Sequence, residues 1–329
     1  MITRNAPREA LLHAILLLLA ALTLAPFYFA VNNSMRTNNQ VLESQFRPPE
    51  ALTNSIAFTV HQIAGRPDDI KVRVYDDEAG ADIDFSTIEP TVVPYGEAIR
   101  LQWRDLSKGY RMAWAEVLNE TTWNSLFIVL LTVTGVLLLG STTAYIFSRH
   151  RFPGHKLLFL LILSVLMIPG VLTLVPAYLI VKSLGLLDSY WVMVLPYVSG
   201  GQIMAIFLFK GFFDGLPEDL FESARLDGAG HAAIYLNIVL PLSKPIMSVV
   251  AILTSMGAWN NFLWPFITVG DDAYLPITAG LYKMSQSALA ANVSTMLAGY
   301  VVASIPLLLL FVFATKPFVQ GVTSGAFKA

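Results

Sequence analysis

Six long stretches without a charged side chain constrain this chain more than any other feature. They are Ala10–Met35, Thr121–Ser148, Leu157–Val181, Ser189–Phe209, Pro245–Gly270 and Met284–Thr315. Each stretch reaches the roughly 20 residues that cross about 30 Å of hydrocarbon as a helix. We therefore expect an all-α polytopic membrane protein with six transmembrane helices.

Charged residues are scarce and unevenly placed, which limits the functions open to the chain. They make up 13% of its 329 residues, and residues 32–122 hold 9 of the 21 basic and 14 of the 23 acidic side chains. An average soluble domain is about 25% charged. A formal net charge of −2 without a basic stripe argues against binding to nucleic acid. The composition also excludes a disordered protein and an ordinary cytosolic enzyme. The absence of cysteine excludes disulfides, a thiol nucleophile and cysteine-ligated metal sites.

Basic residues indicate the orientation of the expected helices. Ten of them lie in Met1–Glu9, Ser148–Lys156, Lys210–Lys244 and Lys316–Ala329, whereas the two short loops on the opposite side hold only Lys182 and Lys283. Because cytoplasmic loops are enriched in Lys and Arg, both termini are expected in the cytoplasm and residues 32–122 outside. The first stretch follows Arg4 and Arg8, as in a cleaved signal peptide, but its length favours an uncleaved anchor.

The extracytoplasmic segment 36–120 is too long for a connector and too polar for a span. Short alternations of apolar and polar residues predict a small β-rich insertion near residues 51–100. The candidate strands are Ile70–Tyr75, Ala81–Phe85 and Ile99–Trp103. Met112–Leu118 is expected to form a short helix leading into the membrane. A partly ordered loop is the alternative.

The cytoplasmic loop Lys210–Lys244 carries the clearest local signals. Pro217 followed by two acidic residues suits the first turn of a helix, and Gly228 suits its end. A second helix is expected over Ala229–Leu240, ending at Pro241. On physical grounds alone, the loop is either an interfacial helix or connector on the lipid surface, or a docking element for a soluble partner.

The spacing within this loop resembles a known signature. Glu222-Ser223-Ala224, three residues, Gly228, nine residues and then Ile238-Val239-Leu240-Pro241 resemble the Glu-Ala-Ala loop of ABC importer permeases. More specifically, the chain resembles the second permease subunit of carbohydrate importers, the maltose-transporter type with six spans. Other matching segments are Arg151–Gly154, Gly185–Trp191, Trp259–Pro265 and Gly321–Lys328. The chain departs from the family at Ser223, at Asn261, where the family often has an acid, and in the insertion near 51–100.

The resemblance implies a mechanism and a set of partners. A coupling helix would dock on an ATPase subunit through Glu222, Ser223, Ala224, Asp227, Gly228, Ile238, Leu240 and Pro241. Glu222 would pair with a basic side chain of the ATPase, while Asp227 is either a cap or a contact. The expected partners are a second permease subunit, two ATP-binding subunits and an extracytoplasmic solute-binding protein, in a bacterial plasma (inner) membrane. ATP and Mg²⁺ would be bound by the ATPases, because this chain has no Gly-x4-Gly-Lys-Ser/Thr loop. Its five histidines show no metal-ligand spacing.

A translocation path is expected where helices are interrupted by proline and polar side chains. Trp259, Asn260, Asn261 and Trp264 are the candidates, because amides and aromatic rings together bind sugars. Interhelical hydrogen bonding with an aromatic belt at the membrane interface is the alternative. The expected organisation is a first helix in 1–35, the outside segment 36–120, a permease core 121–317 and a cytoplasmic tail 318–329. Rival interpretations are an ABC importer of another solute (a polyol, a glycerol phosphate ester or an amino acid), an ATP-independent secondary transporter, and a membrane-anchored enzyme.

Overall fold

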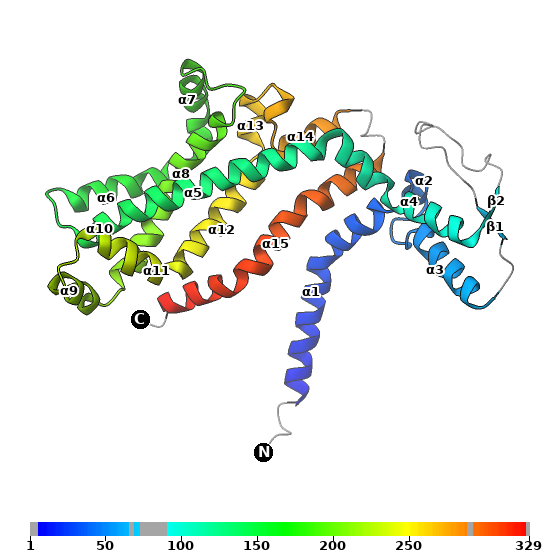
Figure 1. Ribbon diagram of the computed structural model, residues 1–329, viewed down its shortest axis with the longest axis horizontal. Helices are drawn as coiled ribbons and strands as arrows, with labels where there is room; N and C mark the ends of the chain where they lie inside the picture. The colour runs from blue at the N-terminus through cyan, green and yellow to red at the C-terminus, as the bar shows by residue number, and fades with distance from the viewer. Residues whose placement is uncertain (1–5, 66–68, 73–90, 288–291, 327–329) are drawn as a thin grey trace. The chain divides into compact units, whose positions relative to one another are not determined.

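The computed structural model describes residues 6–65, 69–72, 91–287 and 292–326, most of them helical (Figure 1). The chain divides into two compact units. The first comprises residues 1–119 and 281–304, and the second comprises residues 120–280 and 305–329.

The candidate membrane spans are four helices and two bent helix pairs within the described ranges. The four candidates are residues 9–34 of α1 (Ala6–Ser34), residues 95–149, which end in α5 (Asn119–Arg149), all of α8 (Trp191–Asp214), and residues 293–313 of α15 (Val293–Ala326). One pair joins residues 155–167 to α7 (Gly170–Ser183) at 101°, and the other joins residues 231–242 to α12 (Lys244–Asn260) at 75°. The helical fold is thus confirmed, with four spans, or six if each bent pair crosses once.

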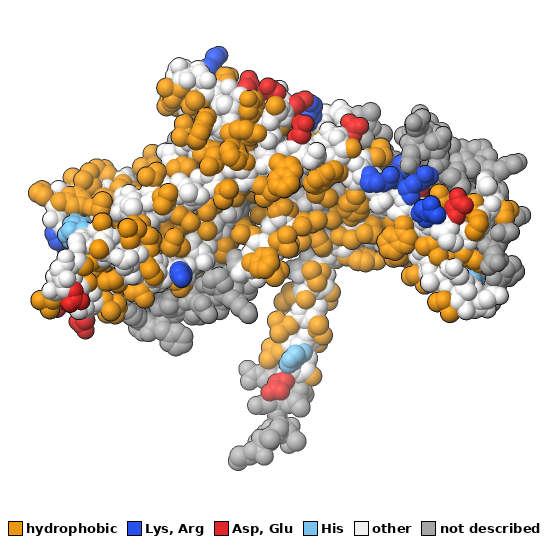
Figure 2. Space-filling view, viewed as in Figure 1, with side chains coloured by type: hydrophobic (Ala, Val, Ile, Leu, Met, Phe, Trp, Pro, Cys, Tyr) orange, Lys and Arg blue, Asp and Glu red, His pale blue; other side chains and the backbone are white. Residues whose placement is uncertain are grey.

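Apolar side chains cover the outer surfaces of these helices (Figure 2). Leu17 of α1 is 71% exposed and Leu172 of α7 is 69% exposed. A water-soluble protein of this size rarely exposes contiguous apolar surface on this scale. Lipid or neighbouring helices are the environment that suits such surfaces.

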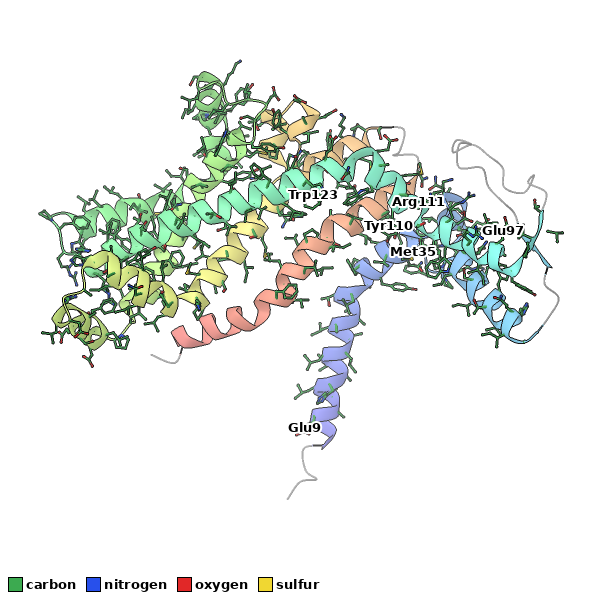
Figure 3. The ribbon with its side chains drawn as sticks, in the orientation of Figure 1. Glu9, Met35, Glu97, Tyr110, Arg111 and Trp123 are labelled. Carbon is green, nitrogen blue, oxygen red and sulfur yellow. The ribbon has the colours of Figure 1, made fainter. Side chains whose placement is uncertain are left out.

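The first unit contains the segment that follows α1, and the described residues of this segment are mostly helical. Its elements after α1 are α2 (Asn38–Glu43), α3 (Glu50–Ile63), β1 (Asp69–Val72), β2 (Thr91–Pro94), α4 (Tyr95–Ala113) and the π-helical turn η2 (Trp114–Leu118). Helix α3 packs on α4, where Phe58 and Leu101 cover the buried Ala98. The Tyr110 hydroxyl, labelled in Figure 3, lies 2.6 Å from that of Ser34 and joins α4 to the end of α1.

The described residues do not support the predicted β-rich insertion. The described residues of the segment contain a single two-stranded antiparallel ladder, in which Asp69 pairs with Pro94 and Val72 with Thr91. The predicted strand Ile70–Tyr75 thus overlaps β1, whereas Ala81–Phe85 lies outside the described residues. Met112–Leu118 is helical as expected, but it forms the end of α4 and η2 within one continuous helix over residues 95–149 rather than a separate short helix.

The third predicted strand, Ile99–Trp103, is part of α4. Five residues alternate there between apolar and polar, which looks like a strand in a short window. Over the whole of α4 the buried positions follow a helical spacing instead: Tyr95, Ala98, Gln102, Leu106, Gly109 and Ala113. The longer period decides the structure because it buries one continuous face, which packs on α3 around Ala98 and on α1 and α15 at Gly109.

The second unit contains the remaining elements, except that α14 continues past residue 280 into the first unit and α15 belongs to the second unit only from residue 305. After α5 come α6 (His155–Ser164), η3 (Val165–Met167), α7, α8, α9 (Glu218–Leu226), α10 (His231–Ile234), η4 (Tyr235–Val239), α11 (Leu240–Leu242), α12, α13 (Leu263–Thr268), η5 (Asp272–Tyr274) and α14 (Ile277–Ser285). One apolar cluster joins α5, α8, α9, η4 and α12 around Phe209, Phe213 and Val239. A second cluster gathers α5, α7, α8 and α13 around Met193 and Trp264.

The fifth expected stretch, Pro245–Gly270, is not one helix. Helix α12 ends at Asn260, and α13 begins at Leu263. Pro265 explains the break, because it lacks the N–H that would bond to the carbonyl of Asn261 in a continuous helix. The Asn261 side chain instead accepts a hydrogen bond from the backbone N–H of Trp264 at 3.3 Å.

Candidate functional site

The loop 210–244 contains a short helix with a tightly defined end. Helix α9 stops at Asp227, and Gly228 follows with φ of 80°. The N–H of Gly228 donates to the carbonyl of Arg225 at 3.0 Å, and that of Ala229 to the carbonyl of Ala224 at 2.9 Å. This pair of bonds is the Schellman motif, which places a left-handed residue at the glycine position. Both the helix and its glycine stop were predicted from local signals.

Helix α9 has one face against its own chain and one face free. Phe221 and Ala224 are buried in the apolar cluster. Glu222, Ser223 and Asp227 are exposed, and Leu226 is 88% exposed. The Ser223 hydroxyl donates back to the carbonyl of Asp219 within the helix. A carboxylate beside an exposed leucine, on a helix fixed from behind, is a surface suited to docking another protein.

The second helix of the loop differs in its limits from the prediction. It begins at His231 and continues through Pro241 to Leu242 as α10, η4 and α11. Pro241 is tolerated because it stands in the first turn of α11. Ile238 packs partly buried against the apolar cluster. Leu240 is half-buried, whereas Pro241 is exposed.

Two histidine rings lie close together at this loop, although no sequence pattern links them. The rings of His150, after α5, and His231, at the start of α10, lie 4.4 Å apart between centroids. Burial lowers the pKa of His150 below its ordinary value, and the neighbouring His231 and Arg225 lower it further. They are 81 residues apart in the sequence (231 minus 150), so local patterns give no signal of this contact.

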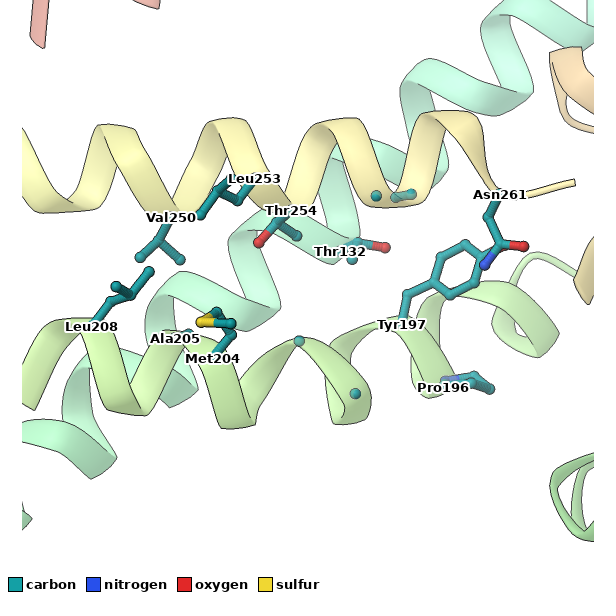
Figure 4. A pocket seen from close by; sticks show the side chains of 14 residues that line it. Thr132, Pro196, Tyr197, Met204, Ala205, Leu208, Val250, Leu253, Thr254 and Asn261 are labelled. Atoms are coloured by element: carbon teal, nitrogen blue, oxygen red, sulfur yellow. The ribbon is translucent and has the colours of Figure 1, made fainter. Parts of the chain in front are cut away.

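A cavity of about 350 Å³ lies between α8 and α12 with α5 beside them (Figure 4). Its lining is mostly apolar and contains Gly200, Gly201 and Gly257. The polar side chains that line it are Thr132, Tyr197, Thr254 and Asn261. The hydroxyls of Thr132 and Tyr197 are buried and have no hydrogen-bond partner among the described residues. Buried hydroxyls without partners cost free energy, and both of these belong to residues that line the cavity.

The structure separates the four candidate residues of the translocation path. Asn261 lines the cavity, and its backbone carbonyl accepts a hydrogen bond from Thr278 at 2.9 Å. Asn260 is exposed and Trp259 is buried. Trp264 is also buried, and its indole Nε1 donates to the carbonyl of Val192 at 2.7 Å, which holds α13 on α8. Sequence reasoning missed Thr132, Tyr197 and Thr254, since hydroxyl residues are common in spans.

Within the described residues, no group of three or more His, Asp or Glu side chains is arranged to hold a metal ion. The candidate site therefore consists of two parts of the second unit: helix α9, whose outer face is exposed, and the partly polar cavity. Neither contains a nucleophile with a neighbouring base.

Comparison with known proteins identifies the family. Residues 136–324 match the family described as binding-protein-dependent transport system inner membrane component. The galactooligosaccharides transport system permease protein GanQ of Bacillus subtilis (strain 168) is 36% identical over 65% of this chain and 76% of its own length. The diacetylchitobiose uptake system permease protein NgcG of Streptomyces coelicolor is 30% identical over 69% of this chain and 75% of its own.

A solved structure shows the same fold. It is described as a bacterial ABC transporter involved in the import of the acidic polysaccharide alginate. Its chain aligns with a TM-score of 0.66 over 97% of this chain and 99% of its own, at 19% identity. The matched family region includes α8 to α14, and with them the loop of α9 and most of the cavity. This chain therefore belongs to the inner membrane components of binding-protein-dependent transport systems, and is a permease subunit rather than an enzyme.

Proposed function

We propose that this chain is one permease subunit of an ATP-driven importer of sugars, and that α9 is its coupling helix. The subunit would form half of the pore. A second permease subunit would form the other half, two ATP-binding subunits would bind ATP and Mg²⁺, and an extracytoplasmic binding protein would deliver the solute.

The observation that carries the proposal is the outward face of α9. Glu222 is exposed and makes no ion pair within the described part of the chain, while Phe221 anchors the helix from behind. An exposed carboxylate on a fixed helix is a suitable partner for an arginine or lysine of an ATPase. Ser223, Ala224, Asp227 and Gly228 complete this element. The following residues Ile238, Leu240 and Pro241 would support it.

The same proposal includes the orientation of the chain in the membrane. The loop 210–244 and both termini would be cytoplasmic, in a bacterial plasma (inner) membrane, because the basic residues gather in those segments. The permease core would be residues 121–317, with a tail at 318–329. The helical segment 36–120 and the loop 271–290 would face the binding protein.

The cavity of α5, α8 and α12 would be part of the solute path. Asn261 and the unpartnered hydroxyls of Thr132 and Tyr197 supply groups that bind sugar hydroxyls. Of the other candidates, Trp264 would position α13 beside the cavity. Trp259 and Asn260 would contribute to the same path from the end of α12. A neutral oligosaccharide is the solute class proposed, since the similar permeases are named for galactooligosaccharides and maltodextrin.

The proposal is tested by purifying the tagged protein from its native membrane under mild conditions and identifying the proteins that accompany it. The wild-type chain is expected to bring a second permease and an ATPase subunit. Glu222→Lys should lose the ATPase, because it reverses the charge on the docking face. Gly228→Pro should do the same, because proline cannot adopt φ of 80°.

The matched control is Glu116→Lys, which makes the same charge change at an exposed carboxylate in η2. It should leave the complex intact. A wild-type chain that purifies without an ATPase, or a Glu222→Lys variant that keeps a full share of it, would contradict the coupling role. Uptake of labelled maltotriose and galactobiose by cells with and without the gene then tests the solute class.

A further inference from the structure

Arg149, the last residue of α5, contacts the end of α8, the linker that follows it and helix α9. Its Nη1 donates to the Glu218 carboxylate at 2.6 Å. Its Nη2 donates to the backbone carbonyls of Phe213 and Leu216. Its guanidinium carbon lies 3.8 Å from the ring centroid of Phe221. One side chain thus contacts the end of α8, the linker after it and two residues of α9.

The burial of the Arg149 side chain makes its charge depend on these contacts. Its side chain is only 9% exposed. A buried charge is strongly unfavourable unless hydrogen bonds and an opposite charge compensate it. Here the compensation comes from the end of α8, from the linker and from α9. Displacing α9 from the end of α5 would therefore leave a buried guanidinium without its anion.

Neighbouring residues strengthen the same joint. The Ser148 hydroxyl donates to Asp214 at 2.6 Å, and Lys210 forms an ion pair with the same carboxylate. Within α9, Arg225 contacts the other oxygen of Glu218 at 3.2 Å. The end of α5 is thereby bonded to α8 and to α9 by two consecutive side chains.

Only an arginine fits all these partners at once. Its planar fork carries five donors, which can serve a carboxylate and two carbonyls, and its flat face stacks on an aromatic ring. A lysine keeps the charge but presents a single point, so it cannot hold both helices in one geometry.

We propose that Arg149 is a positioning residue that fixes the coupling helix α9 to the end of α5, so that movement of α9 driven by the ATPases is transmitted to the span. This inference rests on the proposed function. It adds a residue that does not touch the ATPase and lies outside the signature loop.

The absence of native cysteine makes a direct test feasible. Thr254 lines the cavity, so Thr254→Cys introduces a thiol that reports the state of the path. In the purified complex, the rate of thiol modification is measured without nucleotide and after trapping with ATP and vanadate. The nucleotide-dependent change in rate is the readout, and the amount of ATPase bound is recorded alongside.

Arg149→Met keeps the aliphatic stem but removes the charge and the donors. We expect it to bind the ATPase while its nucleotide-dependent change in thiol modification falls at least about tenfold, because the variant loses the ion pair with Glu218 and the hydrogen bonds to the carbonyls of Phe213 and Leu216. Arg149→Lys should retain part of the change. Arg151→Met is the matched control, since Arg151 is exposed and contacts His155 rather than α9, and it should behave as wild type.

A double variant separates transmission from simple loss of stability. Because Arg149 acts through Glu218, Arg149→Met with Glu218→Gln should be no more impaired than Arg149→Met alone. A full nucleotide-dependent change in Arg149→Met would overturn the proposal. If Arg149→Met does not assemble, Arg149→Lys carries the test, and a full wild-type change in that variant would overturn it equally.

Failure of the proposed function gives a different result. A Thr254→Cys complex with Arg149 intact that contains no ATPase, or whose thiol modification does not respond to ATP and vanadate, removes the coupling role of α9 and this inference with it. A Thr254→Cys complex that responds, together with an unaffected change when Arg149→Met is added, removes only the role of Arg149.

Discussion

Asp188 offers the sharpest test of how the start of α8 is built. It has φ of 53°, a left-handed conformation that is uncommon for residues other than glycine. Its carboxylate oxygen Oδ1 accepts the backbone N–H of Gly270 at 2.6 Å and that of Asp271 at 3.0 Å. One side chain thus ties the turn before α8 to the loop after α13.

The expected costs follow from these two roles. Because Asp188 is exposed, the two hydrogen bonds contribute about 1 kcal/mol each rather than the larger values of buried ones. Asp188→Asn keeps the acceptor and the left-handed preference, so it should cost about 1 kcal/mol. Asp188→Ala loses both bonds and the preference, about 3 kcal/mol in total. Asp188→Gly loses the bonds but relieves about 1–2 kcal/mol of Cβ strain, offset in part by backbone entropy.

Amide hydrogen exchange reads each role separately. The amides of Gly270 and Asp271 should exchange faster in all three variants, least in Asp188→Asn. The amide of Val194, bonded to the carbonyl of Tyr190 in the first turn of α8, should exchange about tenfold faster in Asp188→Ala than in Asp188→Gly. Equal exchange at Val194 in these two variants would refute the left-handed argument, and unchanged exchange at Gly270 would refute the hydrogen bonds.

Other expectations concern the cavity, the packing and pH. Tyr197→Phe should raise the KM for solute uptake about fivefold without lowering the thermal unfolding midpoint, and an unchanged KM would remove its hydroxyl from the path. Trp264→Phe should lower the unfolding free energy by about 2 kcal/mol and leave that KM unchanged, whereas a change confined to KM would favour solute contact. Gly109→Ala should lower the unfolding midpoint of the purified complex, because its Cβ would lie 3.1 Å from the carbonyl oxygen of Ser294 in α15 and 3.2 Å from that of Ser34 in α1. A variant as stable as wild type would contradict this packing. Because the pKa of His150 is lowered in the folded chain, the unfolded chain binds this proton more readily, and stability should fall as pH drops below about 6.5. His150→Gln has no ionisable ring beside His231, so the unfolding midpoint of this variant should fall less over the same pH range.

Local signals were sufficient where the structure is local. The helix α9, its acidic first turn and its glycine stop lie within twelve residues (217 to 228), and each signal acts on the backbone nearby. The charge-free stretches likewise predicted the long helices, because the membrane requirement applies to each span separately. The exact ends differ where a proline or a π-helical turn changes the hydrogen bonding, as at Pro241.

The rest depends on contacts that a single sequence does not encode locally. Arg149 and Glu218 are separated by 69 positions, and nothing near either residue indicates the other. The strand assigned to Ile99–Trp103 failed for a different reason, since a five-residue window cannot distinguish a period of 2 from one face of a longer helix. The hydroxyls of Thr132 and Tyr197 become notable only once the cavity brings them together.

The break after α12 shows how one residue serves structure and function together. Inside a membrane, a helix can be interrupted only where the released backbone groups find partners or line a cavity. Asn261 meets both conditions, because its side chain caps α13 at Trp264, its carbonyl accepts from Thr278, and its amide lines the cavity. The acid that related permeases often have here could accept the same bond, but it would add a charge to a cavity whose other polar groups are neutral. The neutral amide therefore keeps the break satisfied without charging the path, as the proposed passage of an uncharged oligosaccharide requires.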